Sequence, residues 1–126
     1  MLNNKGQKCP FFIGGETMDK IQLKRAWLVT LKARNLYCAL CGTLIESHND
    51  LNADHYFVPK SKGGASDETN LQPVHKWCNS ARADRTLKDW NQHGAEYLAQ
   101  LEQTWHAHHV KFNKIKVAQS IKALLK

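Results

Sequence analysis

Residues 38–84 read CALCGTLIESHNDLNADHYFVPKSKGGASDETNLQPVHKWCNSARAD, and this stretch decides how the chain is interpreted. It opens with Cys38 and Cys41 and closes with His75 and Cys78, and two residues separate the members of each pair. Pairs with this spacing can hold one zinc ion from a tight turn, and four such ligands complete a tetrahedron. Because a four-ligand site leaves no position for substrate, we expect a structural zinc on which folding depends.

The zinc assignment has two alternatives. Cys9 could replace His75 as the fourth ligand, but it lies in a separate, loosely organised segment, so we favour His75. Cys38 and Cys41 could also be buried thiols without a metal. Paired cysteines outside an oxidising compartment indicate metal binding rather than disulfide bonds.

The ends of the chain differ in charge from its middle. The net charge of the 126 residues is +7. Residues 1–37 carry seven basic and two acidic side chains, residues 38–84 four and six, and residues 85–126 seven and three. Basic flanks attract a polyanion, whereas central carboxylates can hold a cation. Lysines on solvated helix faces would give the same composition, so charge alone does not decide whether nucleic acid is bound.

We expect a cytoplasmic protein without a membrane partner. The first ten residues are polar and lack the apolar core of a secretory signal. Apolar runs are all shorter than the ~20 residues that a membrane span requires.

The first regular element is a predicted helix over residues 17–35. Leu23, Trp27 and Leu31 recur at four-residue steps, which is typical of an apolar helix face. Thr17 is the predicted N-cap of this helix.

Two short strands and a helix are expected around the polar motifs. The strands are predicted over residues 52–58 and 71–74, with a loop rich in Gly, Ser and Asp between them. A helix follows from residue 76 to about residue 90. Gly94 predicts a break, after which two amphipathic helices are expected over residues 95–109 and 111–126.

The predicted organisation is one compact unit with three parts. Residues 1–16 form an irregular segment, residues 17–90 a zinc-stabilised core with its leading helix, and residues 91–126 a C-terminal helical extension. A chain of this length allows a single domain.

Several polar residues lie between the two metal-ligand pairs, and their order and spacing match a known pattern. With those pairs they resemble the HNH endonuclease family over about residues 37–84. The matching elements are Cys38-x2-Cys41, Asp54-His55, Pro59, Gly63-Gly64, Asn70-Leu71, His75-x2-Cys78-Asn79 and Ser80 to Asp84. The resemblance implies an α+β fold with a small ββα-metal core, similar to a treble clef, and flanking α-helices.

Two features depart from the family pattern. Pro59 lies four residues after His55, whereas three is common in the family, so one residue is inserted there. His75 also stands where the family often has a cysteine.

The resemblance assigns a role to each polar residue. His55 is the general base, because an imidazole titrates near neutral pH. Asp54 and Asn79 hold one divalent cation, and their oxygen ligands favour Mg²⁺ or Mn²⁺ over zinc. Asn70 braces the loop that orients His55. Taken singly, Asp54, Asn70 and Asn79 would each be ordinary turn or cap residues.

The implied substrate is DNA, which we expect to be double-stranded, and the implied reaction is phosphodiester hydrolysis giving 5′-phosphate and 3′-hydroxyl ends. Lys60, Lys62, Lys76 and Arg82 flank the motif and are candidate phosphate contacts. The resemblance is also compatible with a homodimer, or with a phage or mobile-element protein as partner.

Three alternatives stand beside these assignments. The protein could be an inactive, zinc-stabilised nucleic-acid-binding module. It could also be an interaction subunit whose helices with Trp105 and Leu125 dock on a partner. His106, His108 and His109 could bind a metal, but surface histidines are the favoured interpretation.

Overall fold

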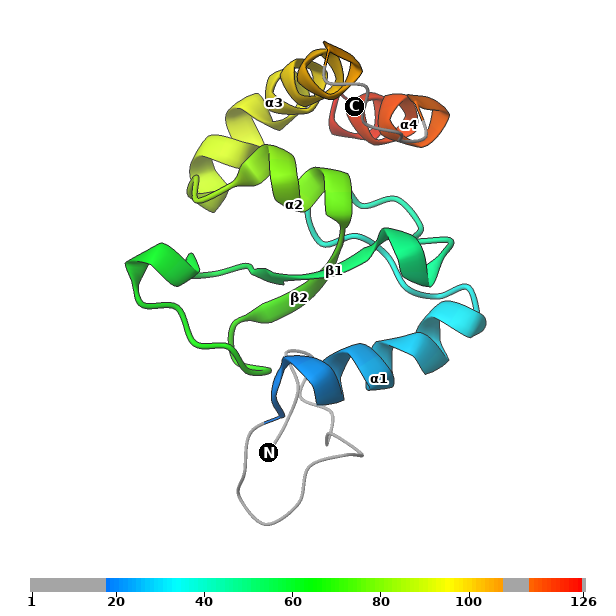
Figure 1. The fold of residues 1–126 in the computed structure, drawn as a ribbon, viewed down its shortest axis with the longest axis vertical. Helices are drawn as coiled ribbons and strands as arrows, with labels where there is room; N and C mark the ends of the chain where they lie inside the picture. Colours follow the sequence, from blue (N-terminus) through cyan, green and yellow to red (C-terminus); the bar gives the residue numbers. More distant parts are fainter. Residues whose placement is uncertain (1–17, 108–113, 126) are drawn as a thin grey trace.

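The computed structural model describes residues 18–107 and 114–125. A two-stranded antiparallel sheet lies between α1 on one face and α2 on the other, and α3 and α4 lie beyond α2 (Figure 1). In chain order the elements are α1 (Lys20–Lys32), the 3-10 turn η1 (His48–Asp50), β1 (Leu51–His55), the 3-10 turn η2 (Lys60–Lys62), β2 (Leu71–His75), α2 (Lys76–Arg82), α3 (Leu87–Ala107) and α4 (Lys114–Leu124). The α+β class with a ββα core and flanking helices is confirmed.

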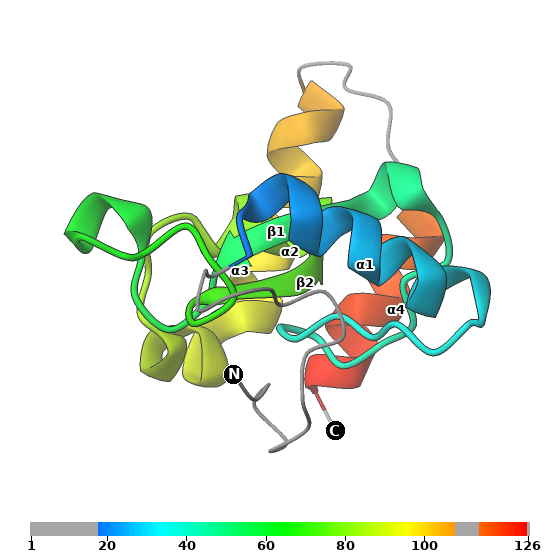
Figure 2. The same cartoon turned by 90° about the horizontal axis from the view of Figure 1, so that it is seen from below.

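Helix α1 begins at Lys20, and its N-cap is Asp19 rather than the predicted Thr17. The Asp19 side chain accepts a hydrogen bond from the Gln22 backbone, and the Gln22 side chain accepts one from the Asp19 backbone. This reciprocal capping box satisfies two free backbone donors and so fixes the start of the helix. Leu23 is its one fully buried residue and faces the hairpin, across which α1 lies (Figure 2).

The hairpin has a regular register that places the candidate residues. Leu51 pairs with His75 at one end, and His55 pairs with Leu71 at the other. The first strand was predicted to run to residue 58 but ends at His55. The chain leaves the ladder there because the next backbone donors bond to Asn70. The inserted residue before Pro59 therefore lies outside the ladder and leaves its register intact.

The single helix predicted over residues 76–90 is two helices. Helix α2 ends at Arg82, and Ala83 has a positive φ of 52°, which is uncommon for a residue with a side chain. The Arg82 side chain donates to the Arg85 carbonyl across this turn at 3.0 Å. The Thr86 hydroxyl then accepts from the Asp89 backbone at the start of α3. Side-chain bonds in the turn thus replace continued helical bonds.

The break predicted at Gly94 is also wrong, because α3 runs through it. A Cβ built on Gly94 would lie 2.9 Å from the ring of Trp90, one turn earlier. The glycine therefore makes room for a fully buried aromatic ring, and the packing outweighs a helix cost of about 1 kcal/mol.

Helix α4 packs back onto the core of the molecule. Ser120 and Val117 are buried, and the Trp77 indole donates to the Ser120 hydroxyl at 3.0 Å. Lys116 bonds to Asp50 at 2.8 Å and so ties α4 to the turn before β1. Within the described parts of the chain, no helix combines the length and apolar character that crossing a membrane requires.

Candidate functional site

The first metal-ligand pair lies on a tight turn. Cys38 and Cys41 are both buried, and the Cys41 backbone donates to the Cys38 sulfur at 3.4 Å. Gly42 then reverses the chain with φ of 80°, a conformation that glycine adopts without strain. The turn is closed by the Gly42 backbone N–H, which donates to the Cys38 carbonyl at 2.8 Å.

The second pair lies where β2 passes into α2. His75 ends the strand and forms the N-cap of the helix, and Cys78 is on its first turn. The His75 backbone donates to the Cys38 sulfur at 3.3 Å, which joins the two pairs. The ligand atoms of Cys38, Cys41, His75 and Cys78 all lie within 4.8 Å of one another. These four residues are therefore positioned to bind a metal ion.

The pKa values of the buried Cys and His side chains indicate that a bound cation would stabilise the cluster. Hydrogen bonds from Cys38 and Cys78 lower the pKa of Cys41, whereas burial raises the pKa of Cys78. Burial lowers the pKa of His75, but hydrogen bonds to the Cys38 and Cys41 sulfurs outweigh it and raise that pKa to about 10. Thiols this close cannot all ionise unless positive charge lies among them, and three thiolates with one imidazole are a typical zinc set.

Neighbouring side chains orient the cluster. His75 Nδ1 lies 3.3 Å from the Cys41 sulfur, while Nε2 lies 3.1 Å from the Leu44 carbonyl. The Trp77 ring stacks on His75 with centroids 4.4 Å apart. The Ser120 hydroxyl of α4 lies 3.5 Å from the Cys41 sulfur. A carbonyl partner on the outer nitrogen is the usual way in which a ligating histidine is held.

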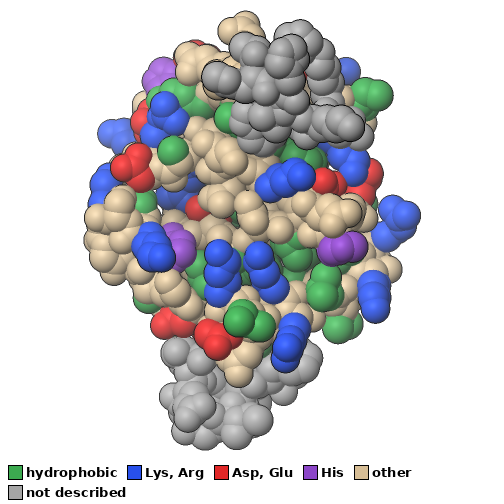
Figure 3. Space-filling view, viewed as in Figure 1, with side chains coloured by type: hydrophobic (Ala, Val, Ile, Leu, Met, Phe, Trp, Pro, Cys, Tyr) green, Lys and Arg blue, Asp and Glu red, His purple; other side chains and the backbone are tan. Residues whose placement is uncertain are grey.

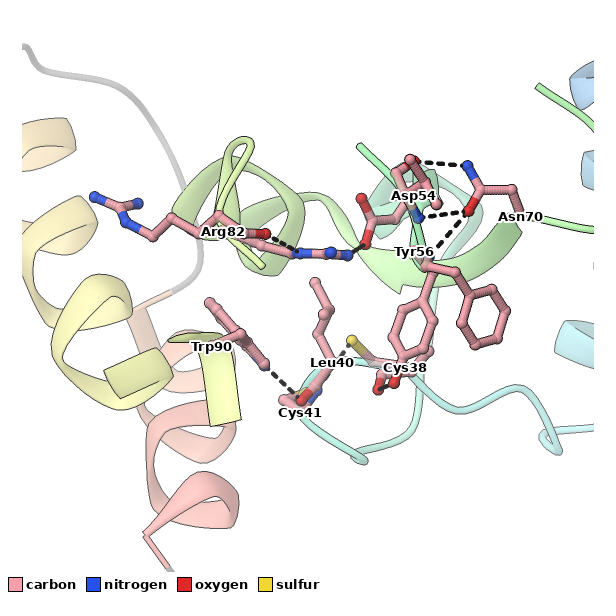
Figure 4. A network of polar contacts seen from close by, with 12 residues as sticks. Cys38, Leu40, Cys41, Asp54, Tyr56, Asn70, Arg82 and Trp90 are labelled. Carbon is pink, nitrogen blue, oxygen red and sulfur yellow. Dashed lines mark hydrogen bonds and ion pairs between the residues drawn. The ribbon is translucent and has the colours of Figure 1, made fainter. Parts of the chain in front are cut away.

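Asp54 lies at the opposite end of the hairpin and faces α2. Its carboxylate accepts a hydrogen bond from Arg82 at 2.6 Å, and the two side chains are 6% and 1% exposed (Figure 4). Burial raises the pKa of Asp54, against the opposing effect of Arg82. The pair brings α2 directly over β1. Asn79 lies one turn before Arg82 on the same helix, where i and i+3 positions are neighbours.

His55 projects to the opposite face of the strand from Asp54, because successive side chains alternate. Its Nε2 lies 2.9 Å from the Ser66 hydroxyl, in the loop between the strands. Burial and then the positive charge of Lys20, with a smaller contribution from Lys60, lower the pKa of His55. A neutral imidazole is therefore favoured at neutral pH, which is the form that can accept a proton.

Asn70 holds the chain segment that follows His55. Its amide oxygen accepts from the backbones of Phe57 and Val58 at 3.0 and 2.8 Å, and its amide nitrogen donates to the carbonyls of Val58 and Ala65 (Figure 4). The amide thus uses both of its oxygen lone pairs and both of its hydrogens. A Cβ on Gly64 would lie 1.9 Å from the Val58 carbonyl, so only glycine permits this close packing.

The candidate phosphate contacts differ in exposure. Lys60 and Lys62 are exposed on η2, and Lys76 is half-buried at the start of α2. Arg82 is buried against Asp54, so its contact with a phosphate would require that pair to open. Lys and Arg side chains are spread over the face in Figure 3 with acidic side chains among them.

Two residues near His55 had not been predicted as site residues. Ser66 lies in a loop whose Gly, Ser and Asp content indicated only turns, and Lys20 lies in the predicted helix. The Glu68 backbone donates to the Met18 carbonyl and so joins this loop to the start of α1. Cys9, Trp105 and the His106, His108 and His109 side chains lie outside the described residues.

Comparison with known families supports the motif. Residues 38–85 match the family model described as HNH endonuclease. The resemblance inferred from the spaced residues is thereby confirmed. No curated protein and no solved structure matches the chain.

Proposed function

Because residues 38–85 match the HNH endonuclease family, we propose that this protein hydrolyses phosphodiester bonds in DNA with one divalent cation and a histidine general base. The observation that carries the proposal is the pair of supports around His55. Ser66 bonds to the ring, and Asn70 holds the two backbone amides that begin two residues later. A histidine without a function on the protein surface would need neither the Ser66 contact nor the Asn70 hydrogen bonds.

In this proposal the Ser66 hydroxyl, 2.9 Å from His55 Nε2, accepts the Nε2 proton and so selects the tautomer with a free Nδ1 lone pair. That lone pair takes a proton from the attacking water. The lowered pKa of His55 keeps this nitrogen unprotonated at neutral pH. Asn70 limits the movement of the chain next to the ring, so the base meets the water in one orientation.

Asp54 and Asn79 would hold Mg²⁺ or Mn²⁺, for which their carboxylate and amide oxygens are suitable ligands. A cation bound there would offset the charge that develops on the phosphate and on the leaving oxygen. Arg82 already balances the Asp54 carboxylate. Affinity for the cation should therefore be low until a phosphate adds negative charge to the site.

We propose zinc for the cluster of Cys38, Cys41, His75 and Cys78, with His75 binding through Nδ1. The donor set is that of structural sites, and its burial keeps substrate away. This ion would supply folding energy rather than chemistry.

We further propose that the substrate is double-stranded DNA in the cytoplasm. None of the described cysteines forms a disulfide bond, which suits a reducing compartment. The exposed Lys60 and Lys62 are available to backbone phosphates. Lys76 at the start of α2 would make a weaker contact from its half-buried position.

One observation favours a second function, an inactive nucleic-acid-binding module. The Asp54 carboxylate is bound to a buried arginine, and in an inactive protein this ion pair could take the place of a metal. Such a module would bind DNA equally well with and without chelator and would leave it uncut.

A plasmid-nicking assay tests the two functions against each other. Nicking should require Mg²⁺ or Mn²⁺, stop when EDTA is added and resume when Mg²⁺ is in excess. His55→Ala should lower the rate by about 10²–10⁴-fold. His93→Ala is the matched control, because His93 is an exposed histidine on α3, and it should cut normally. Full activity of His55→Ala would refute the assignment of the base.

A further inference from the structure

Two large apolar side chains are exposed immediately after the candidate base. Phe57 is 51% exposed and Val58 is 43% exposed. They lie two and three residues after His55, in the segment where β1 has already left the ladder. Side chains of this kind normally gain stability by burial, so these two contribute little to the fold where they are.

The backbone beneath these side chains is held firmly. Both amides donate to the Asn70 side chain, and the Val58 carbonyl accepts from it at 2.7 Å. The Phe57 ring packs edge-on against Tyr56, with centroids 5.0 Å apart and planes at 89°. Pro59, which follows, is buried. The exposed pair is therefore presented on a preorganised backbone, which lowers the entropy lost when it binds.

The exposed pair also lies beside positive charge. Lys60 and Lys62 follow on η2 and are exposed. An aromatic ring flanked by lysines suits nucleic acid, because rings stack on bases while ammonium groups bind phosphates. A purely apolar protein partner would leave both lysines without a partner.

The exposed pair lies in a segment that is one residue longer than the common family pattern. The chain has one residue more between His55 and Pro59 than is common in the family it resembles. The ladder ends at the pair of His55 and Leu71, so the additional residue lies outside it, in the segment that carries Phe57 and Val58. The exposed pair therefore lies where this chain departs from the family pattern.

We propose that Phe57, with Val58 beside it, is an apolar wedge that inserts against a base next to the cleaved phosphate, so that DNA with a weakened base step is the preferred substrate. The proposal rests on the proposed nuclease function. Two residues span at most ~7 Å, which is about two base steps of 3.4 Å, so the wedge acts within that distance of His55. A side chain that separates stacked bases costs least where stacking is already weak.

The test uses the full-length His55→Ala protein, which should bind DNA without cutting it. The probe is a duplex of roughly twenty base pairs with a central mismatch flanked by 2-aminopurine, whose fluorescence rises when it leaves the stack. We expect binding to raise the fluorescence and to be tighter than binding to the fully paired duplex. Adding Phe57→Ala should abolish the rise and weaken mismatch binding by about 5- to 150-fold, the equivalent of losing one stacked base.

The controls separate the wedge from the nuclease. Ile21→Ala removes another exposed apolar side chain, on α1, and should change neither signal. Phe57→Trp should keep both, since the larger ring also stacks. Binding without any fluorescence change, or equal binding by Phe57→Ala, overturns the wedge and leaves the nuclease standing. If the native protein neither binds nor cuts DNA, the proposed function fails and the wedge fails with it.

Discussion

The two ends of one short hairpin have opposite characters. We call Cys38, Cys41, His75 and Cys78 the thiol end, and Asp54, His55, Asn70 and Arg82 the carboxylate end. All four residues of the thiol end are buried. At the carboxylate end Asp54 is buried, but His55 is half-buried and the loop beyond it is exposed.

Helix α2 supplies a side chain to both ends. Cys78 on its first turn reaches the thiol end, and Arg82 on its last turn reaches Asp54. The thiol end can bind an ion without any help from solvent or substrate. The carboxylate end is partly exposed, and in the proposed function a cation and a phosphate complete it. In the proposed function, zinc at the buried thiol end gives this small protein the rigidity to hold the exposed carboxylate end in place.

The largest effect should come from the thiol end. Cys38→Ser should abolish zinc binding and cooperative folding, since a structural zinc contributes about 10–16 kcal/mol and a whole domain is stable by only about 5–15. Zinc content by elemental analysis and thermal unfolding by circular dichroism measure this. Cys9→Ser is the control and should retain zinc. Loss of zinc from Cys9→Ser with retention in His75→Ala would instead make Cys9 the fourth ligand.

The next effect concerns the buried ion pair of the carboxylate end. Arg82→Met leaves the Asp54 carboxylate buried without its partner and should lower the free energy of unfolding by about 3–5 kcal/mol at pH 7. Asp54→Asn combined with Arg82→Met should regain most of this loss. Urea unfolding of the three proteins gives the values. A loss under 1 kcal/mol for the single variant would show that the pair is not closed in solution.

A smaller effect is expected from the support of the base. Ser66→Ala removes the partner of His55 Nε2, so the ring can adopt either tautomer. The nicking rate should fall by about tenfold, which corresponds to the loss of one hydrogen bond of about 1.4 kcal/mol. The melting temperature should not change. Ser61→Ala, on the exposed η2 turn, is the matched control.

The smallest effect is a displacement of the pH profile. Burial and the nearby Lys20 charge lower the pKa of His55, so the rate should fall only below the ordinary histidine value of about 6.5, as the ring gains a proton. For the same reason His55 stabilises the fold above pH 6.5, and this contribution is lost as the pH falls through its lowered pKa. Lys20→Met should move the acid limb of the rate profile upward. An unchanged limb would mean that His55 does not set it.

Much of the candidate site could be predicted because it depends on local spacing. Two residues between ligands define a turn that can hold a metal wherever it occurs, and the thiol cluster formed as expected. The alternation of side chains along a strand is an equally local rule, and it places Asp54 and His55 on opposite faces. The apolar residues at four-residue steps predicted the first helix in the same local way.

The missed features depend on contacts between distant residues. Nothing local marks Ser66 as the partner of His55, or Arg82 as the partner of Asp54 rather than of a phosphate. Gly94 continues its helix only because the Trp90 ring packs over it. Phe57 is exposed because the Asn70 side chain binds its backbone and so ends the ladder before it. The position of this end cannot be predicted from residue spacing.

The amino-acid sequence by itself determined the spacing of the two Cys/His pairs, the α+β class and the match of residues 38–85 to the HNH endonuclease family model, since these follow from residue types at fixed separations. The tertiary structure decided which charges and hydroxyls meet, because that depends on how α1, α2 and the loop before Asn70 pack on the hairpin. Local sequence preferences favour several possible partners equally, and tertiary packing decides which of them meet. Residues far apart in the chain that become partners therefore have no signature in the local sequence.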